Sequence, residues 1–290
     1  MPASAVYRGI NAMVLYAVIQ ALVWALVRYL SDDLSTGTLI FFRNLIGFLM
    51  AVPLLLRGGF GLFKTRRFPV HILRAGAAFT GGIAAFYAVA HAPLATVVAI
   101  TYTAPIFASL FAMVVYKEGL TTARVVVLLV GFGGTLMVLR PQFDMDIGGL
   151  IGAVVAAIAS AVAFLTVKQL SSTERTETIV AYPFLLILPF SAVFAYLDWT
   201  PPTWEDAPLI VLMGVGISAG QYFMARAFAV ADAAAVLPFD FFRLLVAALV
   251  GVLAFGDTVD SWVLVGALVI LAATIYSAKM EQAATVQAAE

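Results

Sequence analysis

Ten long apolar segments, separated by short polar connections, account for nearly the whole chain. They cover residues 10–30, 36–56, 70–90, 94–116, 122–139, 148–169, 178–197, 207–229, 233–254 and 260–278. Each approaches or exceeds the about 20 apolar residues with which an α-helix crosses a bilayer. Each is also apolar on all sides, whereas a strand of a membrane barrel would alternate apolar and polar positions. The pattern predicts an all-α polytopic membrane protein with ten transmembrane helices.

The segments fall into two related sets of five. Tyr87-Ala-Val-Ala-His91 in the first set matches Phe228-Ala-Val-Ala-Asp232 in the second, and other matched positions keep an offset of 139 to 141 residues. Because each half holds an odd number of spans, the second half must enter the membrane with the opposite orientation. We therefore expect two inverted five-helix repeats, at 1–142 and 143–280, followed by a cytoplasmic tail at 281–290. Inverted repeats of this kind are typical of secondary transporters, whose substrate site lies where the halves meet.

Composition narrows the class further. Hydrophobic residues make up 63% of the chain and charged residues 11%, which excludes a soluble domain of this size and makes the lipid bilayer its surroundings. The absence of cysteine excludes disulfides, thiolate metal sites and thiol catalysis. The two histidines are too scattered to predict a metal site. The first apolar run is followed by Asp32 and Asp33 instead of a cleavage motif, so we interpret it as a transmembrane helix and not as a signal peptide.

The charges are distributed unequally between alternate connections. One side collects twelve basic residues, namely Arg8, Arg57, Lys64, Arg66, Arg67, Arg74, Lys117, Arg124, Lys168, Arg175, Arg226 and Lys279. The other side has only Arg28 and Arg140, beside Asp32, Asp33, Asp144, Asp146, Asp198, Glu205, Asp206, Asp257 and Asp260. Basic residues of short loops are retained in the cytoplasm, so both termini are expected there. The same rule accounts for the basic run at 64–67, and no nucleic-acid partner is predicted.

Short motifs in the two halves give a more specific indication. The first half reads Pro105-Ile-Phe107, then Glu118, then Gly131-Phe-Gly-Gly134, and ends in Leu139-Arg140-Pro141. The sequence resembles the EamA repeats of the drug/metabolite transporter superfamily. The second half departs from that pattern, with Arg243-Leu-Leu in place of Pro-x-Phe and Asp257 in place of Glu.

The resemblance implies ten helices, no bound cofactor and a small-molecule substrate. It implies a carrier in the bacterial inner membrane, most often an exporter of amino acids or similar small metabolites. A monomer is the expected state, although the residues do not determine it. Uptake or exchange of nucleotide-type metabolites or drugs is the alternative, because related carriers of the superfamily do this.

Three charged residues lie at membrane depth, where each costs about 2.5 to 3.5 kcal/mol on insertion scales. They are Arg43, Asp240 and Arg243. Asp240 and Arg243 are three residues apart and share a helix face, so they can simply neutralise each other. Alternatively, the arginines bind a substrate carboxylate, for which a guanidinium is geometrically suited, while Asp240 orients them or meets an ammonium group.

Polar and small residues line one face of each of four helices at helical spacing. These faces are Thr80, Ala84, Tyr87 and His91; Val98, Tyr102, Pro105 and Ser109; Gly214, Ser218, Gln221 and Ala225; and Val236, Asp240, Arg243 and Ala247. We expect them to surround a central cavity, with Tyr87, Tyr102, Ser109, Ser218 and Gln221 joining the three charged residues as substrate contacts. Ordinary hydrogen bonds between helices are the alternative for Tyr102 and Gln221.

Proline leaves a carbonyl unpaired and bends a transmembrane helix. Pro105 and Pro238 lie in the fourth and ninth predicted helices and are candidate hinges. Static packing geometry is the alternative interpretation of both.

The sequence lacks the residue patterns that other membrane-protein functions require. An intramembrane enzyme would need a metal motif, an aspartate pair or a serine–histidine dyad, and none is evident, so no enzyme is predicted. A channel usually shows rings of repeated polar residues, and the connections are too short to hold a receptor domain. No phosphate-binding loop for ATP is present. The sequence therefore predicts a secondary transporter that works by alternating access around a midplane cavity.

Overall fold

The computed structural model describes residues 3–58, 65–91, 94–116, 121–140, 146–256 and 261–287. Throughout these ranges the secondary structure is helical. The predicted boundary between residues 142 and 143 lies outside them. So do several charges of the sidedness argument, namely Lys64, Lys117, Asp144, Asp257 and Asp260, as well as Glu118 of the repeat motif.

The first repeat contains α1 (Ala3–Leu30), α2 (Thr36–Gly58), α3 (Phe68–His91), α4 (Leu94–Thr101), α5 (Ala104–Tyr116) and α6 (Thr122–Leu139). The second contains α7 (Ile147–Ser171), α8 (Thr176–Leu197), α9 (Ala207–Val230), α10 (Ala233–Val236), the 3₁₀ segment η2 (Leu237–Phe241), α11 (Phe242–Phe255) and α12 (Ser261–Gln287). Helix α12 thus extends to Gln287, where a tail was expected from residue 281. All ten predicted segments are helical, but the fourth and the ninth are interrupted.

Local sequence explains several helix ends. The Asp146 side chain accepts a hydrogen bond from the Gly148 backbone nitrogen at 3.0 Å and caps α7, as short acidic side chains do at helix starts. Gly256 ends α11 with φ +68°, a left-handed conformation that glycine adopts without a steric penalty.

In the described part of the chain, six helical stretches are by themselves long and apolar enough to cross a membrane. They are Ala5–Leu30, Thr122–Leu139, Ile147–Ser171, Thr176–Leu197, Ala207–Val230 and Leu237–Ala254. Shorter apolar helical stretches are Thr36–Val52, Val97–Ala112 and Ser261–Ser277.

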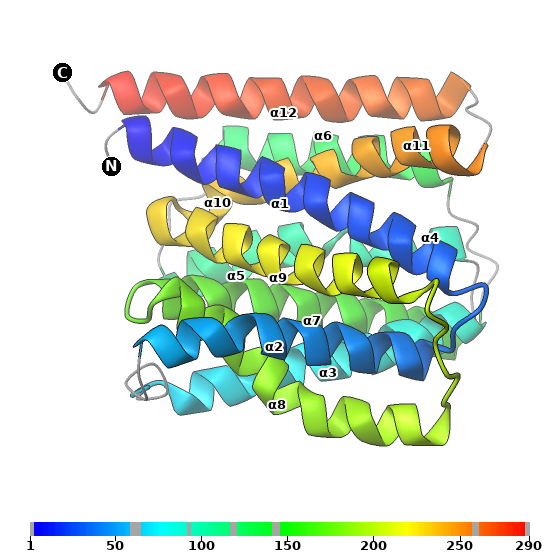
Figure 1. Ribbon diagram of the computed structural model, residues 1–290. Coiled ribbons are helices and arrows are strands. Elements are labelled where there is room, and N and C mark those ends of the chain that lie inside the picture. Colours follow the sequence, from blue (N-terminus) through cyan, green and yellow to red (C-terminus); the bar gives the residue numbers. More distant parts are fainter. Residues whose placement is uncertain are drawn as a thin grey trace.

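The helices form one bundle with their axes roughly side by side (Figure 1). The start of α1 and the end of α12 lie at the same end of this bundle, which we call the terminal end. The colours of Figure 1 show that α1 starts at the terminal end and α7 at the opposite end, so the corresponding first helices of the two repeats run in opposite directions.

Helices of the first repeat pack directly against helices of the second. Helix α1 of the first repeat packs against α9 and α11 of the second, and α7 of the second packs against α3 and α5 of the first. The pairs α2 with α8 and α6 with α12 complete the arrangement. At the α6–α12 crossing, a Cβ atom on Gly266 would lie 2.7 Å from the Gly134 carbonyl oxygen, so this close approach requires glycine.

The largest buried cluster lies between the two repeats. It includes Met13 of α1, Ala108 of α5, Leu165 of α7, Phe228 of α9 and Phe239 of η2. Because five elements from both halves contribute to one core, the repeats form a single folded unit.

Candidate functional site

The interruption of the ninth predicted helix holds the buried acidic residue. Pro238 lies near the start of η2, where proline is tolerated because its missing N–H would have no helical partner. Asp240 follows in the same 3₁₀ segment and is 1% exposed. Its Oδ2 atom lies 3.3 Å from Nη2 of Arg243 in the first turn of α11. The structure thus contains the ion pair that the three-residue spacing made possible.

The interruption of the fourth predicted helix lies beside this ion pair. The guanidinium carbon of Arg243 lies 5.0 Å from the centre of the Tyr102 ring, within the range of a cation–π contact. Tyr102 also stacks on Phe241, with ring centres 6.3 Å apart. Tyr102 and Phe241 are 139 residues apart, the offset of the repeats. Equivalent breaks in the two halves therefore meet at Asp240 and Arg243.

Tyr16 of α1 is a further member that the sequence analysis missed. Its side chain is 4% exposed, lies beside Gln20 of the next turn, and is within electrostatic range of both Asp240 and Arg243. The pair Tyr16 and Gln20, four residues apart in an otherwise apolar stretch, was the available signal. We call Tyr16, Gln20, Tyr102, Asp240 and Arg243 the central site.

Several buried polar atoms of the central site lack a hydrogen-bond partner in the described part of the chain. Asp240 Oδ1, Arg243 Nε and Gln20 Oε1 are all buried without a hydrogen bond to any described residue. Buried polar atoms in proteins are nearly always bonded to protein or to water. The central site therefore retains one donor and two acceptors that a polar ligand or ordered water can satisfy.

Gln221, predicted to line the cavity, takes part in another contact. Its Oε1 atom accepts a hydrogen bond of 2.8 Å from Nη2 of Arg74 on α3. Arg74 was counted among the loop charges, and this was wrong: the residue lies inside α3 and is 4% exposed. Like Asp240, it is a charged residue buried among the helices.

The remaining predicted contacts have other surroundings. Ser109 of α5 is 1% exposed and its hydroxyl has no partner in the described ranges. Ser218 donates to the Gly214 carbonyl of its own helix at 2.9 Å. Tyr87 is 48% exposed near the end of α3, where it stacks on His91 at 4.2 Å. Arg43 is exposed on α2 and has no hydrogen-bond or ion-pair partner among the described residues. The ion pair and the cation–π contact therefore join Tyr102, Asp240 and Arg243, and not these four residues.

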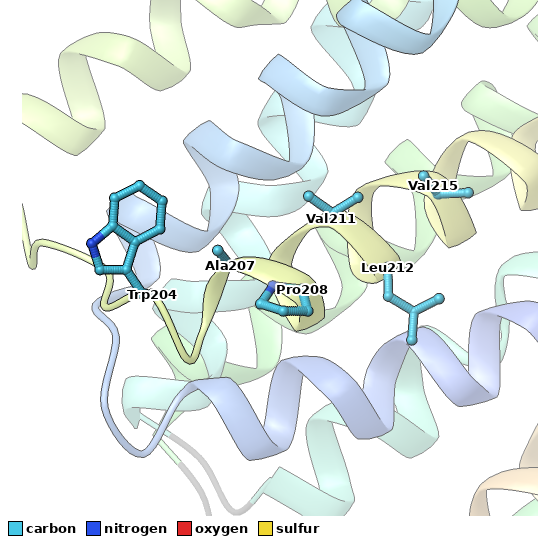
Figure 2. Close-up of a pocket in the computed structure, with 6 residues that line it drawn as sticks. All are labelled: Trp204, Ala207, Pro208, Val211, Leu212 and Val215. Carbon is cyan, nitrogen blue, oxygen red and sulfur yellow. The ribbon is translucent and has the colours of Figure 1, made fainter.

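An apolar groove runs along α9 and the turn before it. Figure 2 shows its lining, which consists of Trp204, Ala207, Pro208, Val211, Leu212 and Val215. Trp204 is 94% exposed and Leu212 56%, as expected for side chains that face lipid, with tryptophan near the membrane interface. The groove presents no charged side chain, so it does not share the chemistry of the central site.

Comparisons with known proteins give a consistent result. The sequence profile described as the EamA-like transporter family matches residues 7–140 and again residues 147–278. A riboflavin transporter of Brucella anthropi is 30% identical over 81% of this chain and 85% of its own length. An S-adenosylmethionine uptake transporter of Rickettsia bellii is 27% identical over 86% of each chain.

Two further proteins are also similar. A pseudopaline exporter of Pseudomonas aeruginosa is 30% identical over 87% of this chain and 89% of its own length. A crystal structure covering 96% of this chain and 97% of its own superposes with a TM-score of 0.80 at 20% identity, a likeness of fold alone.

Proposed function

Because the chain belongs to the EamA-like transporter family, and so to the drug/metabolite transporter superfamily, we propose that it is a ten-span carrier with its substrate site between two inverted halves. The observation that supports this most is the meeting of both helix breaks at the Asp240–Arg243 ion pair. Broken helices at the interface of inverted repeats are where carriers bind their substrates. Movement of the helices on either side of the breaks would then expose the site to each membrane face in turn.

The orientation belongs to the same proposal. The charge asymmetry of the connections supports cytoplasmic termini, even with Arg74 removed from the count. The start of α1 and the end of α12 lie at one end of the bundle (Figure 1), as an even number of crossings requires. The membrane we propose is the bacterial inner membrane.

The central site favours a substrate that combines a flat ring with polar groups. The Tyr102 and Phe241 rings offer a stacking surface, and Arg243 and Asp240 offer a donor and an acceptor. Riboflavin and S-adenosylmethionine, carried by two relatives, both contain flat nitrogen heterocycles. We therefore place uptake of a nucleotide-type metabolite first.

Export of amino acids or similar metabolites, the first expectation from sequence, is the second candidate. The opposite charges of Asp240 and Arg243 suit the ammonium and carboxylate groups of a zwitterion. One relative at 30% identity is an exporter of pseudopaline, which supports keeping this candidate.

Counterflow into proteoliposomes tests the proposal. Vesicles with the purified protein are loaded with unlabelled riboflavin, S-adenosylmethionine or a single amino acid, and entry of the labelled compound is followed. We expect saturable exchange for the heterocyclic compounds, and none in vesicles without protein. Exchange of amino acids alone would select the second candidate. Ionic conductance without exchange would contradict a carrier.

A further inference from the structure

A second group of buried polar residues lies between the repeats, on α3. His71 and Arg74 are one helical turn apart and are 0% and 4% exposed. Residues at this spacing share a helix face, and here the face meets α8 and α9. Arg74 Nη1 donates to the Ile179 carbonyl at the start of α8, and Nη2 donates to Gln221 of α9. The contacts thus cross from the first repeat to the second.

The positive charge of Arg74 has no negative partner here. Both of its acceptors are neutral, and no carboxylate of the described residues lies within ion-pair distance. Glu174, in the connection before α8, accepts a hydrogen bond of 2.5 Å from the Thr65 hydroxyl. A buried guanidinium is normally paired, because burying a lone charge is costly. The site therefore has an excess positive charge.

His71 provides a second, independent indication. Its ring stacks on Tyr182 of α8 with the ring centres 4.1 Å apart. Although the residue is completely buried, neither Nδ1 nor Nε2 has a hydrogen-bond partner among the described residues. A neutral imidazole always carries one N–H donor, and a buried donor without an acceptor calls for a missing ligand.

We propose that Arg74 and His71 form an oxyanion subsite, which takes a carboxylate or phosphate group. The guanidinium retains donors beyond those used for Ile179 and Gln221, and its planar fork matches either oxyanion. The imidazole N–H adds a donor one turn away. Since the partners of Arg74 lie in the other repeat, separation of α3 from α8 and α9 frees the guanidinium for the anion.

The subsite also defines the substrate more closely, and this extension rests on the proposed transport function. A carrier with a cationic subsite beside its path prefers a substrate that bears an anionic group. Among flavins, the 5′-phosphate is therefore preferred over neutral riboflavin. Anion binding itself does not depend on transport and can be measured separately.

Thermal unfolding of the purified full-length protein in detergent measures anion binding directly. Inorganic phosphate or succinate is titrated against chloride at constant ionic strength, because a ligand that binds the native state raises the Tm. We expect a rise for the wild type and an affinity at least about tenfold weaker in Arg74→Gln, which loses the charge-assisted hydrogen bonds. The variant Glu177→Gln should retain the rise, because it removes only a carboxylate that is paired at the surface with Arg175.

A milder variant covers the case in which Arg74→Gln does not fold. His71→Phe keeps a ring to stack on Tyr182 and removes both ring nitrogens, so it should weaken the phosphate effect without loss of folding. The absence of any rise in the wild type would overturn the subsite. An equal rise in wild type, Arg74→Gln and His71→Phe would overturn it as well.

Competition in counterflow then tests the extension to substrates. Flavin 5′-phosphate should inhibit entry of labelled riboflavin more strongly than unlabelled riboflavin does, and Arg74→Gln should abolish this preference. Equal inhibition in the wild type would contradict the extension. If phosphate raises the Tm while none of the tested compounds is exchanged, the oxyanion subsite stands and the proposed transport of these compounds fails.

Discussion

At the scale of single residues, the Asp240–Arg243 pair offers a direct separation of structure from recognition. Arg243→Gln leaves Asp240 buried without its counter-charge, and loss of one partner of a buried ion pair costs about 3 to 5 kcal/mol. The double variant Asp240→Asn/Arg243→Gln leaves neither charge and should unfold at a temperature closer to that of the wild type. If the pair binds substrate, however, the double variant should insert and fold but not transport.

Thermal unfolding and counterflow on the same preparations check both parts. A suitable control is Glu177→Gln, which removes a carboxylate paired at the protein surface with Arg175 and should change neither measurement. Transport at the wild-type rate by the double variant would show that the pair only stabilises the fold.

The same residues show how far sequence reasoning reaches. The pairing of Asp240 with Arg243 followed from three-residue spacing, because neighbours in one helical segment are fixed by geometry. The contact of Arg243 with Tyr102 joins residues 141 positions apart and depends on how the two breaks pack. Arg74 was misassigned because it lies only six residues after the start of α3, where hydropathy does not distinguish a cytoplasmic charge from a buried one.

At the scale of helices, the prolines beside the two breaks are the candidate moving parts. Pro105 is the second residue of α5, directly after the break at Tyr102 and Thr103. Pro105→Ala restores an N–H that can bond a carbonyl of α4, which would favour a continuous helix and shift the balance between inward- and outward-open states. A shift of about 1.4 kcal/mol changes the ratio of two populations tenfold.

The expected result is a lower rate of exchange with normal membrane insertion. The labelling rate of a single thiol placed at Ala247 of α11 should change as well. Pro189→Ala is the matched control, since Pro189 lies within the continuous helix α8. Unchanged flux and unchanged labelling in Pro105→Ala would show that the proline contributes only to packing and is not a hinge.

Helix positions were easier to predict than helix continuity or packing. The ten apolar segments were recognised because a bilayer imposes their length. Their interruptions are not visible as a change in hydropathy. At the first break, Thr101 and Thr103 donate through their hydroxyls to the carbonyls of Val98 and Ile100, a local competition with helical bonding. The pairing of α1 with α9 and of α3 with α7 depends on side-chain shape across the repeats.

At the scale of the whole molecule, hydrogen bonds join the repeats both before α3, where Thr65 donates to Glu174, and at the start of α2, where Thr38 donates to the Thr200 carbonyl. Within the second repeat, Lys168 near the end of α7 donates to the Ala231 carbonyl at 2.6 Å and to the Phe228 carbonyl at 3.3 Å, and so interacts with the last carbonyls of α9. Its repeat counterpart is Arg28 of α1, 140 residues earlier. Since two inverted halves can exchange conformations, we expect the contacts between the repeats at the two ends to loosen in turn.

The proposed orientation of the molecule can be tested with one pair of equivalent residues. Ser31 follows α1 and Ser172 follows α7, an offset of 141, and both are exposed. The chain has no native cysteine, so Ser31→Cys and Ser172→Cys each introduce a single thiol of nearly the same size. Inverted repeats with cytoplasmic termini place Ser31 outside and Ser172 inside. In intact cells, a membrane-impermeant maleimide should label the thiol at 31 at once and the thiol at 172 only after permeabilisation. Labelling of both thiols from outside would refute the inverted topology. Labelling of the thiol at 172 but not of the thiol at 31 in intact cells would show that the orientation is the opposite of the one proposed.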